Sequence, residues 1–159
     1  MTVPSASLPT GCMIRRATAQ DQWRIRQLVL SAKLDPTQLR WQQFWVIEDQ
    51  KKVIACGQLR SFENAQELGS LVVAKPWRDR GLGTVLTQHL IEEATQPLYL
   101  ECLGQRLAQF YARFGFVPVS WQALPRSLQL KFGLSQLAKK VFRLPVAIMV
   151  YQGQSKSPS

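Results

Sequence analysis

Residues 65–94 combine three patterns that restrict what this chain can fold into. Ala65–Ala74 is rich in Leu and Val, which predicts a strand. Apolar side chains recur at helical spacing from Leu82 to Ile91, which predicts an amphipathic helix over Gly83–Ala94. A loop with two glycines joins the two. A strand, a short glycine-bearing loop and a helix in this order can form an anion-binding site.

The loop Arg78–Gly83 has the features of an anion-binding site. The first turn of a helix leaves amide N–H groups unpaired, and the helix dipole adds partial positive charge there. Gly81 and Gly83 carry no side chain that would keep a phosphate away from those amides. Arg78 and Arg80 add two cations, which suit a diphosphate. The pattern therefore predicts a pyrophosphate-binding loop.

Two other kinds of phosphate-binding loop are excluded at named positions. A dinucleotide-binding loop has a third glycine where this chain has Leu86. A nucleoside-triphosphate loop has Lys followed by Ser or Thr after its last glycine, where this chain has Thr84 and Val85. The remaining alternative is an ordinary tight turn into a helix, which would not require two arginines.

Further strand and helix patterns extend over the rest of the chain. Strands are predicted at residues 13–17, 44–47, 53–59, 98–103, 116–119 and 144–151. A first helix is predicted after the capping pattern Thr18–Asp21. Further helices are predicted around Thr37–Gln43, around Leu107–Phe114 and within Pro125–Arg143. We expect a single domain over residues 13–151. An N-terminal extension over 1–12, a basic helical insertion over 122–143 and a flexible tail over 152–159 complete the expected organisation.

Charge and cysteine usage narrow the class of protein. The chain has 20 Lys and Arg residues against 10 Asp and Glu, a formal net charge of +10, which favours an anionic partner. Cys12, Cys56 and Cys102 match neither metal-ligand spacing nor a disulfide framework, so we expect no metal. No apolar run reaches the roughly 20 residues that cross a bilayer. We expect a cytoplasmic location, with an organelle stroma or matrix as the alternative.

The motif Arg78-x-x-Gly81-x-Gly83 resembles the acetyl-CoA signature of the GNAT acetyltransferase superfamily. Ile14–Thr18 is similar to the opening strand of that family, and Phe110–Phe116 to its late helix-to-strand junction. The resemblance covers roughly residues 13–151. It implies a mixed α/β fold with a splayed, mostly antiparallel seven-stranded sheet flanked by helices. It also implies an acetyl-CoA-dependent N-acetyltransferase.

The resemblance further implies which residues bind the donor. The strand backbone would bind the pantetheine arm at Leu71, Val72 and Val73, and an N–H near Val73 would polarise the thioester carbonyl. The pyrophosphate would bind the loop and the first helical turn, that is Arg78, Asp79, Arg80, Gly81, Leu82, Gly83 and Thr84. The chain departs from the family at Gly104, where the family often has an Asn after the fifth strand.

Three side chains are candidates for proton transfer. An acceptor amine with a pKa of about 10 must lose a proton before it attacks, and the leaving thiolate must gain one. Tyr111 is similar to the tyrosine acid of the family, and its alternative role is that of a core aromatic. Glu67 and Glu101, on neighbouring strands, are alternative bases, with Glu67 preferred.

The acceptor is predicted only as a primary amine, on a protein N-terminus, a lysine or a small molecule. The alternative function is a basic acetyl-CoA-binding module, associated with the ribosome or a nucleic acid, without catalysis. Within Pro125–Arg143, an apolar face formed by Leu130, Leu134, Leu137 and Val141 accompanies Arg126, Lys131, Lys139, Lys140 and Arg143. This segment is predicted to cover the core, and a lid over the acceptor or a contact with a membrane or nucleic acid are the alternatives. Either a monomer or a homodimer is compatible with the sequence.

Overall fold

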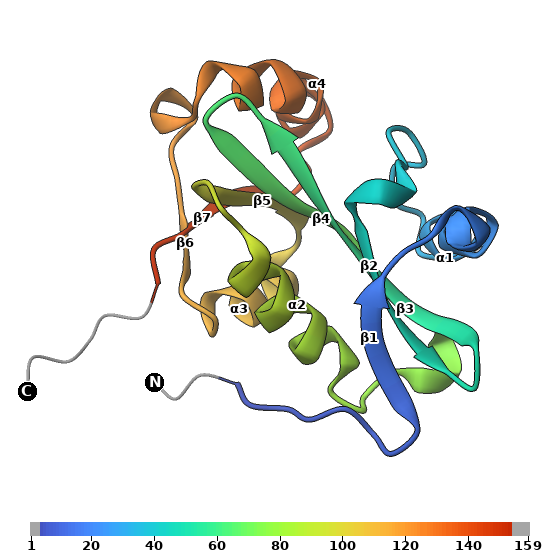
Figure 1. Cartoon of the computed structure of the whole chain (residues 1–159). Coiled ribbons are helices and arrows are strands. Elements are labelled where there is room, and N and C mark those ends of the chain that lie inside the picture. The colour runs from blue at the N-terminus through green and yellow to red at the C-terminus, as the bar shows by residue number, and fades with distance from the viewer. Residues whose placement is uncertain (1–3, 154–159) are drawn as a thin grey trace, which may run out of the picture. The chain divides into compact units, whose positions relative to one another are not determined.

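A computed structural model describes residues 4–153 (Figure 1). The fold is mixed α/β, as predicted. Its elements are β1 (Cys12–Arg16), α1 (Gln22–Ser31), β2 (Phe44–Asp49), β3 (Lys52–Phe62), β4 (Ala65–Val73), α2 (Leu82–Glu93), β5 (Leu98–Leu103), α3 (Gln105–Ala112), β6 (Phe116–Pro118), α4 (Arg126–Phe142) and β7 (Val146–Tyr151).

The strands form one seven-stranded sheet in the order β1-β2-β3-β4-β5-β7-β6. The pairs β1–β2, β2–β3, β5–β7 and β6–β7 are antiparallel, and β4 pairs with β5 in parallel. The mostly antiparallel sheet flanked by helices is therefore confirmed. The chain divides into two compact units. We call residues 5–60 and 68–94 the N-terminal unit, and residues 61–67 with residues 95–153 the C-terminal unit.

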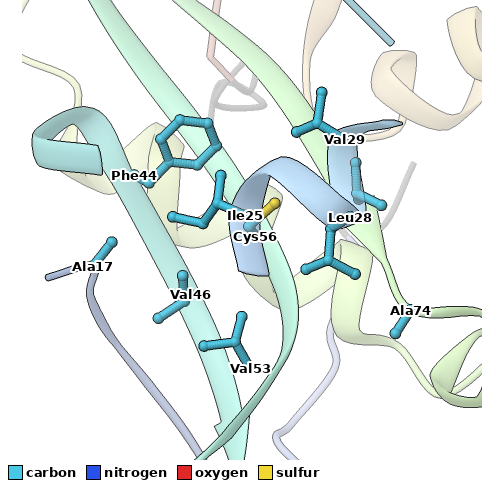
Figure 2. Packing of buried hydrophobic residues seen from close by; sticks show 10 residues of the cluster. Ala17, Ile25, Leu28, Val29, Phe44, Val46, Val53, Cys56 and Ala74 are labelled. Carbon is cyan, nitrogen blue, oxygen red and sulfur yellow. The ribbon is translucent and has the colours of Figure 1, made fainter. Parts of the chain in front are cut away.

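In the N-terminal unit, α1 and α2 cover opposite sides of the strands (Figure 1). The α1 side is packed by Ile25, Leu28 and Val29, the predicted stripe of that helix, and all three are buried. Figure 2 shows these side chains turned toward the strands. Their partners in this cluster include Phe44, Val46, Val53, Cys56 and Ala74.

The α2 side of the N-terminal unit is a second apolar cluster. Leu82 and Leu86 of α2 pack with Ile47 of β2 and with Ile54 and Ala55 of β3. The neighbours Ile54 and Ala55 both belong to this cluster because the β2–β3 register shifts between Ile47 and Glu48, which is a β-bulge. The buried Leu82 fixes the first turn of α2 to the sheet.

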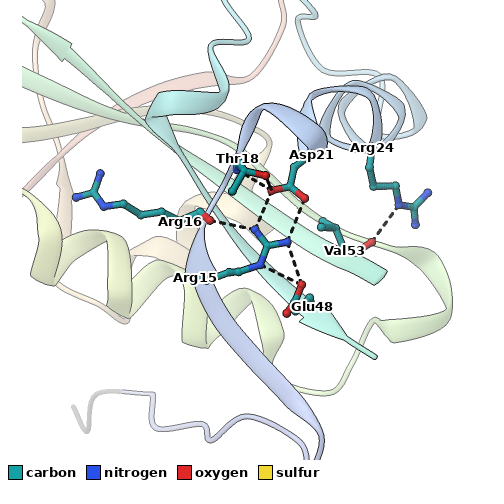
Figure 3. A network of polar contacts seen from close by, with 7 residues as sticks. All are labelled: Arg15, Arg16, Thr18, Asp21, Arg24, Glu48 and Val53. Atoms are coloured by element: carbon teal, nitrogen blue, oxygen red, sulfur yellow. Dashed lines mark hydrogen bonds and ion pairs between the residues drawn. The ribbon is translucent and has the colours of Figure 1, made fainter. Parts of the chain in front are cut away.

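A charged network holds the start of the chain against α1 and β2 (Figure 3). The Arg15 guanidinium donates to Asp21 Oδ2 at 2.8 Å and pairs with Glu48 Oε2 at 2.9 Å. The Thr18 amide donates to the same Asp21 oxygen at 2.7 Å, as in the predicted capping pattern. The Arg15 hydrogen bond, opposed in part by burial, lowers the pKa of Asp21.

In the C-terminal unit, α3 and α4 lie on opposite sides of β5 and β7 (Figure 1). Leu128 and Phe132 of α4 pack against Tyr99 of β5 and Ile148 of β7. The register of β5 on β7 is regular from Tyr99 to Leu103, so side chains alternate between the α4 face and the α3 face. Glu101 pairs with Ile148 and therefore lies on the α4 face.

The predicted helix around Thr37–Gln43 was wrong. Only Trp41–Gln43 forms a single 3-10 turn, because Gln38 takes a left-handed backbone with a φ of 59°. The predicted tail begins with Gln152, whose amide donates to the Gly115 carbonyl at 3.0 Å, and its residues 154–159 lie outside the described part. Among residues 4–153, no helix combines the length and apolar character needed to cross a bilayer.

Candidate functional site

The loop between β4 and α2 is shaped by its backbone. A 3-10 turn over Lys75–Trp77 follows β4. Asp79 and Gly81 both take left-handed conformations, with φ values of 63° and 80°, and Gly81 is the N-cap of α2. Leu82 follows at once and is only 1% exposed. The start of α2 is therefore anchored by the core on one side and formed by small or exposed residues on the other.

The charges of this loop favour an anion. Arg78 and Arg80 are exposed. The Arg78 side chain donates to the Val73 carbonyl oxygen at 3.2 Å, and the Arg80 guanidinium stacks 4.8 Å from the centre of the Trp77 ring. No acidic residue lies in the first turn of α2, and no side chain caps its N-terminus. Amides and cations thus meet at one end of the helix, where a diphosphate binds best.

The predicted donor-binding residues differ in which of their atoms a ligand can contact. Val72 and Leu82 are buried, so only their backbone can contact a ligand. Leu71 and Val73 pack on the α2 side and Val72 on the α1 side, so the strand alternates there. Further back along β4, the regular alternation of side chains that a strand has is interrupted, because Ser70 has a φ of 49°.

In the C-terminal unit, two carboxylates meet a lysine of α4. Glu67 is 4% exposed, and its Oε2 lies 3.2 Å from Lys131 Nζ. Glu101 is hydrogen-bonded to Ser135, one turn along α4 from Lys131, and interacts electrostatically with Glu67 and Lys131. We call Glu67, Glu101, Lys131 and Ser135 the acid cluster. When its three charged members are ionised, the cluster has one net negative charge.

Glu101 has the properties of a base. Burial raises the pKa of Glu101, the Ser135 hydrogen bond lowers it, and Glu67 raises it while Lys131 lowers it, with a net rise. Its Oε2 is buried and has no hydrogen-bond partner in the part of the chain that the structure describes. A carboxylate whose pKa moves toward neutral pH and whose oxygen is unpaired can accept a proton from a bound group.

Tyr111 lies on the other face of β5. Cys102 follows Glu101 along the strand and faces α3, where Tyr111 is buried between Phe110 and Phe116. Burial raises the pKa of Tyr111, and Cys102 raises it further, so the phenol is protonated at neutral pH. The structure therefore brings Glu67 and Glu101 together and places Tyr111 across the strand from them.

One edge of β5 has little strand pairing. Its other edge pairs with β7 from Tyr99 to Leu103. Toward β4, pairing is limited to Leu98 and Tyr99 in the described residues. Glu101 and Cys102 thus lie on the part of β5 beyond the described pairing with β4.

Sequence reasoning missed two members of the acid cluster. Lys131 was treated as one of several surface cations, and Ser135 was not considered. Their spacing of four residues beside the buried Leu128 and Phe132 was the available signal. Within residues 4–153, no group of three or more His, Cys, Asp and Glu side chains could hold a metal ion.

The apolar face predicted to cover the core was also assigned wrongly. Leu130 and Leu134 are 78% and 82% exposed, and Leu137 and Val141 are exposed as well. The core is instead covered by Leu128 and Phe132 on the opposite side of α4.

Comparison with known proteins identifies the family. Residues 40–118 match the family model of the acetyltransferase (GNAT) domain, and this range includes the β4–α2 loop, Glu67, Glu101 and Tyr111. Residues 40–118 therefore carry a GNAT acetyltransferase domain.

One protein is similar to this chain in sequence, and two solved structures are similar to it in fold. The amino-acid acetyltransferase of Shewanella oneidensis is 28% identical over 139 residues, which are 79% of this chain and 31% of that protein. An N-acetylglutamate synthase from Neisseria gonorrhoeae, complexed with coenzyme A and N-acetyl-glutamate, has a TM-score of 0.71 and 20% identity over 94% of this chain and 37% of that one. A Mycobacterium tuberculosis protein complexed with coenzyme A has a TM-score of 0.69 and 21% identity over 87% and 98%. The GNAT domain thus spans about a third of the length of the first two proteins.

Proposed function

We propose that this chain transfers the acetyl group of acetyl-CoA to the amine of a small amino acid. The observation that carries the proposal is the acid cluster, in which the half-buried carboxylate of Glu101, whose pKa is raised, adjoins the ion pair of Glu67 and Lys131. Similarity to an amino-acid acetyltransferase supports an amino acid as the acceptor. A peptide or protein amine is the competing acceptor.

The donor would be held at two places. Its pyrophosphate would bind the first-turn amides of α2, with Arg78 and Arg80 beside them, because this helix end has no carboxylate in its first turn. Its pantetheine amides would bind the strand backbone of β4 at Leu71, Val72 and Val73.

The acceptor would be bound as an ammonium ion, whose charge balances the net negative charge of the acid cluster. Glu101 would take one proton from it, and the freed amine would attack the carbonyl carbon of the thioester. The carbon–sulfur bond would break as the carbon–nitrogen bond forms. Tyr111 would give its proton to the leaving thiolate from the opposite face and regain one from solvent. The nitrogen would lose its second proton to solvent, and Glu101 would release the proton that it took, so one proton is released in each turnover.

An acceptor panel tests the activity. Purified protein is incubated with acetyl-CoA and, separately, with free amino acids, peptides with free N-termini and polyamines. Released thiol and the mass of the product are measured. We expect turnover with free amino acids. Turnover with peptides alone would contradict the acceptor class, and acetyl-CoA binding without turnover on any amine would contradict catalysis.

Substitution of Glu101 by Gln tests the base. We expect kcat/KM to fall by about 10²- to 10⁴-fold, the usual contribution of a general base, with acetyl-CoA affinity unchanged. Glu63→Gln is the matched control, because Glu63 is an exposed carboxylate of the same unit. If Glu67→Gln alone abolishes turnover and Glu101→Gln does not, the base is Glu67.

A further inference from the structure

The outer side of α4 is an unusual surface. Leu130, Leu134, Leu137 and Val141 follow one another at spacings of four, three and four residues, and all four are more than half exposed. This spacing places them in one line along the helix. Phe142 and Leu144 extend the exposed apolar surface past the helix end. We call these six residues the α4 stripe.

The α4 stripe is not an unused part of the core. The other side of the helix already packs Leu128 and Phe132 into the C-terminal unit, and both are at most 2% exposed. The 17-residue helix is roughly 25 Å long, so its apolar line is much longer than the isolated exposed leucines that most surfaces have. Such a surface indicates an interaction site.

The charge around the α4 stripe has one sign. All ten acidic residues of the chain lie within residues 1–101, together with twelve Lys and Arg, whereas residues 102–159 contain eight Lys and Arg and no acid. The net charge is therefore +2 for the first part and +8 for the second. Arg126, Lys140 and Arg143 are exposed on α4 and directly after it.

The exposed apolar line and the positive charge around it together indicate the kind of partner that binds here. We propose that the α4 stripe and its flanking cations dock this protein on an anionic lipid surface. An apolar line bordered by cations matches a bilayer interface, where Leu and Phe enter the acyl boundary while Lys and Arg meet anionic headgroups. The inference goes beyond the proposed function, because it uses residues outside the loop and the acid cluster.

Two other partners use only part of this surface. A nucleic acid would pair with the cations but would leave the exposed leucines in water. A second copy of the chain would cover the leucines but would bring cations of the same sign together in a symmetric interface. A lipid surface satisfies both the apolar and the charged residues.

Vesicle flotation tests the proposal on the whole chain. Vesicles of phosphatidylcholine alone are compared with vesicles that also contain phosphatidylglycerol, at low and high salt. We expect flotation with the phosphatidylglycerol vesicles, weakened by salt, and little with phosphatidylcholine alone. A double substitution Leu134→Gln and Leu137→Gln should lower the vesicle partition coefficient on the order of tenfold or more. A double substitution Lys140→Gln and Arg143→Gln should lower it by a similar factor.

Leu30→Gln is the matched control, because Leu30 is also a half-exposed leucine, located on α1. It should leave flotation unchanged, and thermal melting should show that every variant is folded. Absence of flotation with either vesicle would overturn the proposal. So would flotation that the α4 substitutions leave unchanged. Dimerisation in light scattering that Leu134→Gln abolishes, or oligonucleotide binding in place of flotation, would assign the surface to another partner.

Discussion

Replacing Gly81 by Ala tests whether the backbone at the start of α2 binds the donor. Gly81 has φ and ψ of 80° and 5°, a left-handed conformation that costs a residue with a Cβ about 1–2 kcal/mol. The added Cβ would lie 3.0 Å from the Cβ of Ala6, so the segment that carries Ala6 must shift. We expect the free energy of unfolding to fall by about 1–2 kcal/mol.

The same change should weaken donor binding, because the first-turn amides of α2 depend on the backbone of Gly81. We expect the Kd for acetyl-CoA, measured by isothermal titration calorimetry, to rise at least tenfold, or about 1.4 kcal/mol. Denaturant unfolding measures the stability cost separately.

Gly153→Ala is a matched control, because Gly153 has a similar φ of 76° and, among residues 4–153, no atom lies within 4 Å of an added Cβ. It should leave the Kd unchanged. A second variant, Gly81→Ala with Ala6→Gly, relieves the contact with Ala6 while keeping the backbone strain. Unchanged acetyl-CoA affinity in Gly81→Ala would refute the pyrophosphate site at this loop.

Three further expectations concern packing, charge and the acid. In denaturant titrations, Phe132→Ala should lower the free energy of unfolding by about 3–5 kcal/mol. Leu134→Ala should change it by less than about 0.5 kcal/mol. Equal effects of the two substitutions would contradict the assignment of the α4 faces. Asp21→Asn should cost about 1–3 kcal/mol at neutral pH. The pKa of Asp21 is lower in the folded state than in the unfolded state, so the Asp21 carboxylate stabilises the fold above its ordinary pKa. This stabilisation is lost as the pH falls through the pKa of Asp21 in the folded state. The difference in stability between Asp21→Asn and the parent protein should therefore vanish in acid. Tyr111→Phe should lower kcat about 10²- to 10⁴-fold in the thiol-release assay. Tyr99→Phe is the control and should leave kcat unchanged, because Tyr99 is a buried tyrosine on the other face of β5. If the Tyr111→Phe variant is fully active, Tyr111 is a core aromatic and not the acid.

Local patterns were sufficient for most of the fold, including the loop between β4 and α2. The strand, glycine loop and helix over residues 65–94 are contiguous, so their physical requirements can be tested residue by residue. Gly81 illustrates this, since a left-handed N-cap is a local property. The helix around Thr37–Gln43 failed for a local reason as well, because Gln38 adopts a left-handed backbone that ends helical pairing.

The acid cluster could not be predicted in the same way. Glu67 and Lys131 are 64 positions apart, and no local pattern links them. On α4, helical spacing produces two apolar lines, one through Leu128 and Phe132 and one through Leu130 and Leu134. Sequence alone does not determine which line meets the sheet, because both have the same period. The packing of the C-terminal unit makes that choice.

The placement of Glu101 and Tyr111 on opposite faces of β5 has a chemical consequence. If the phenol contacted the carboxylate directly, it would donate a hydrogen bond to the ionised form, and the pKa of Glu101 would fall. Separated by the strand, each group is governed by its own burial, which raises the pKa of both. The raised pKa makes Glu101 a stronger base, while Tyr111 keeps its proton. In the proposed mechanism, the strand between them therefore keeps the base and the acid from neutralising each other.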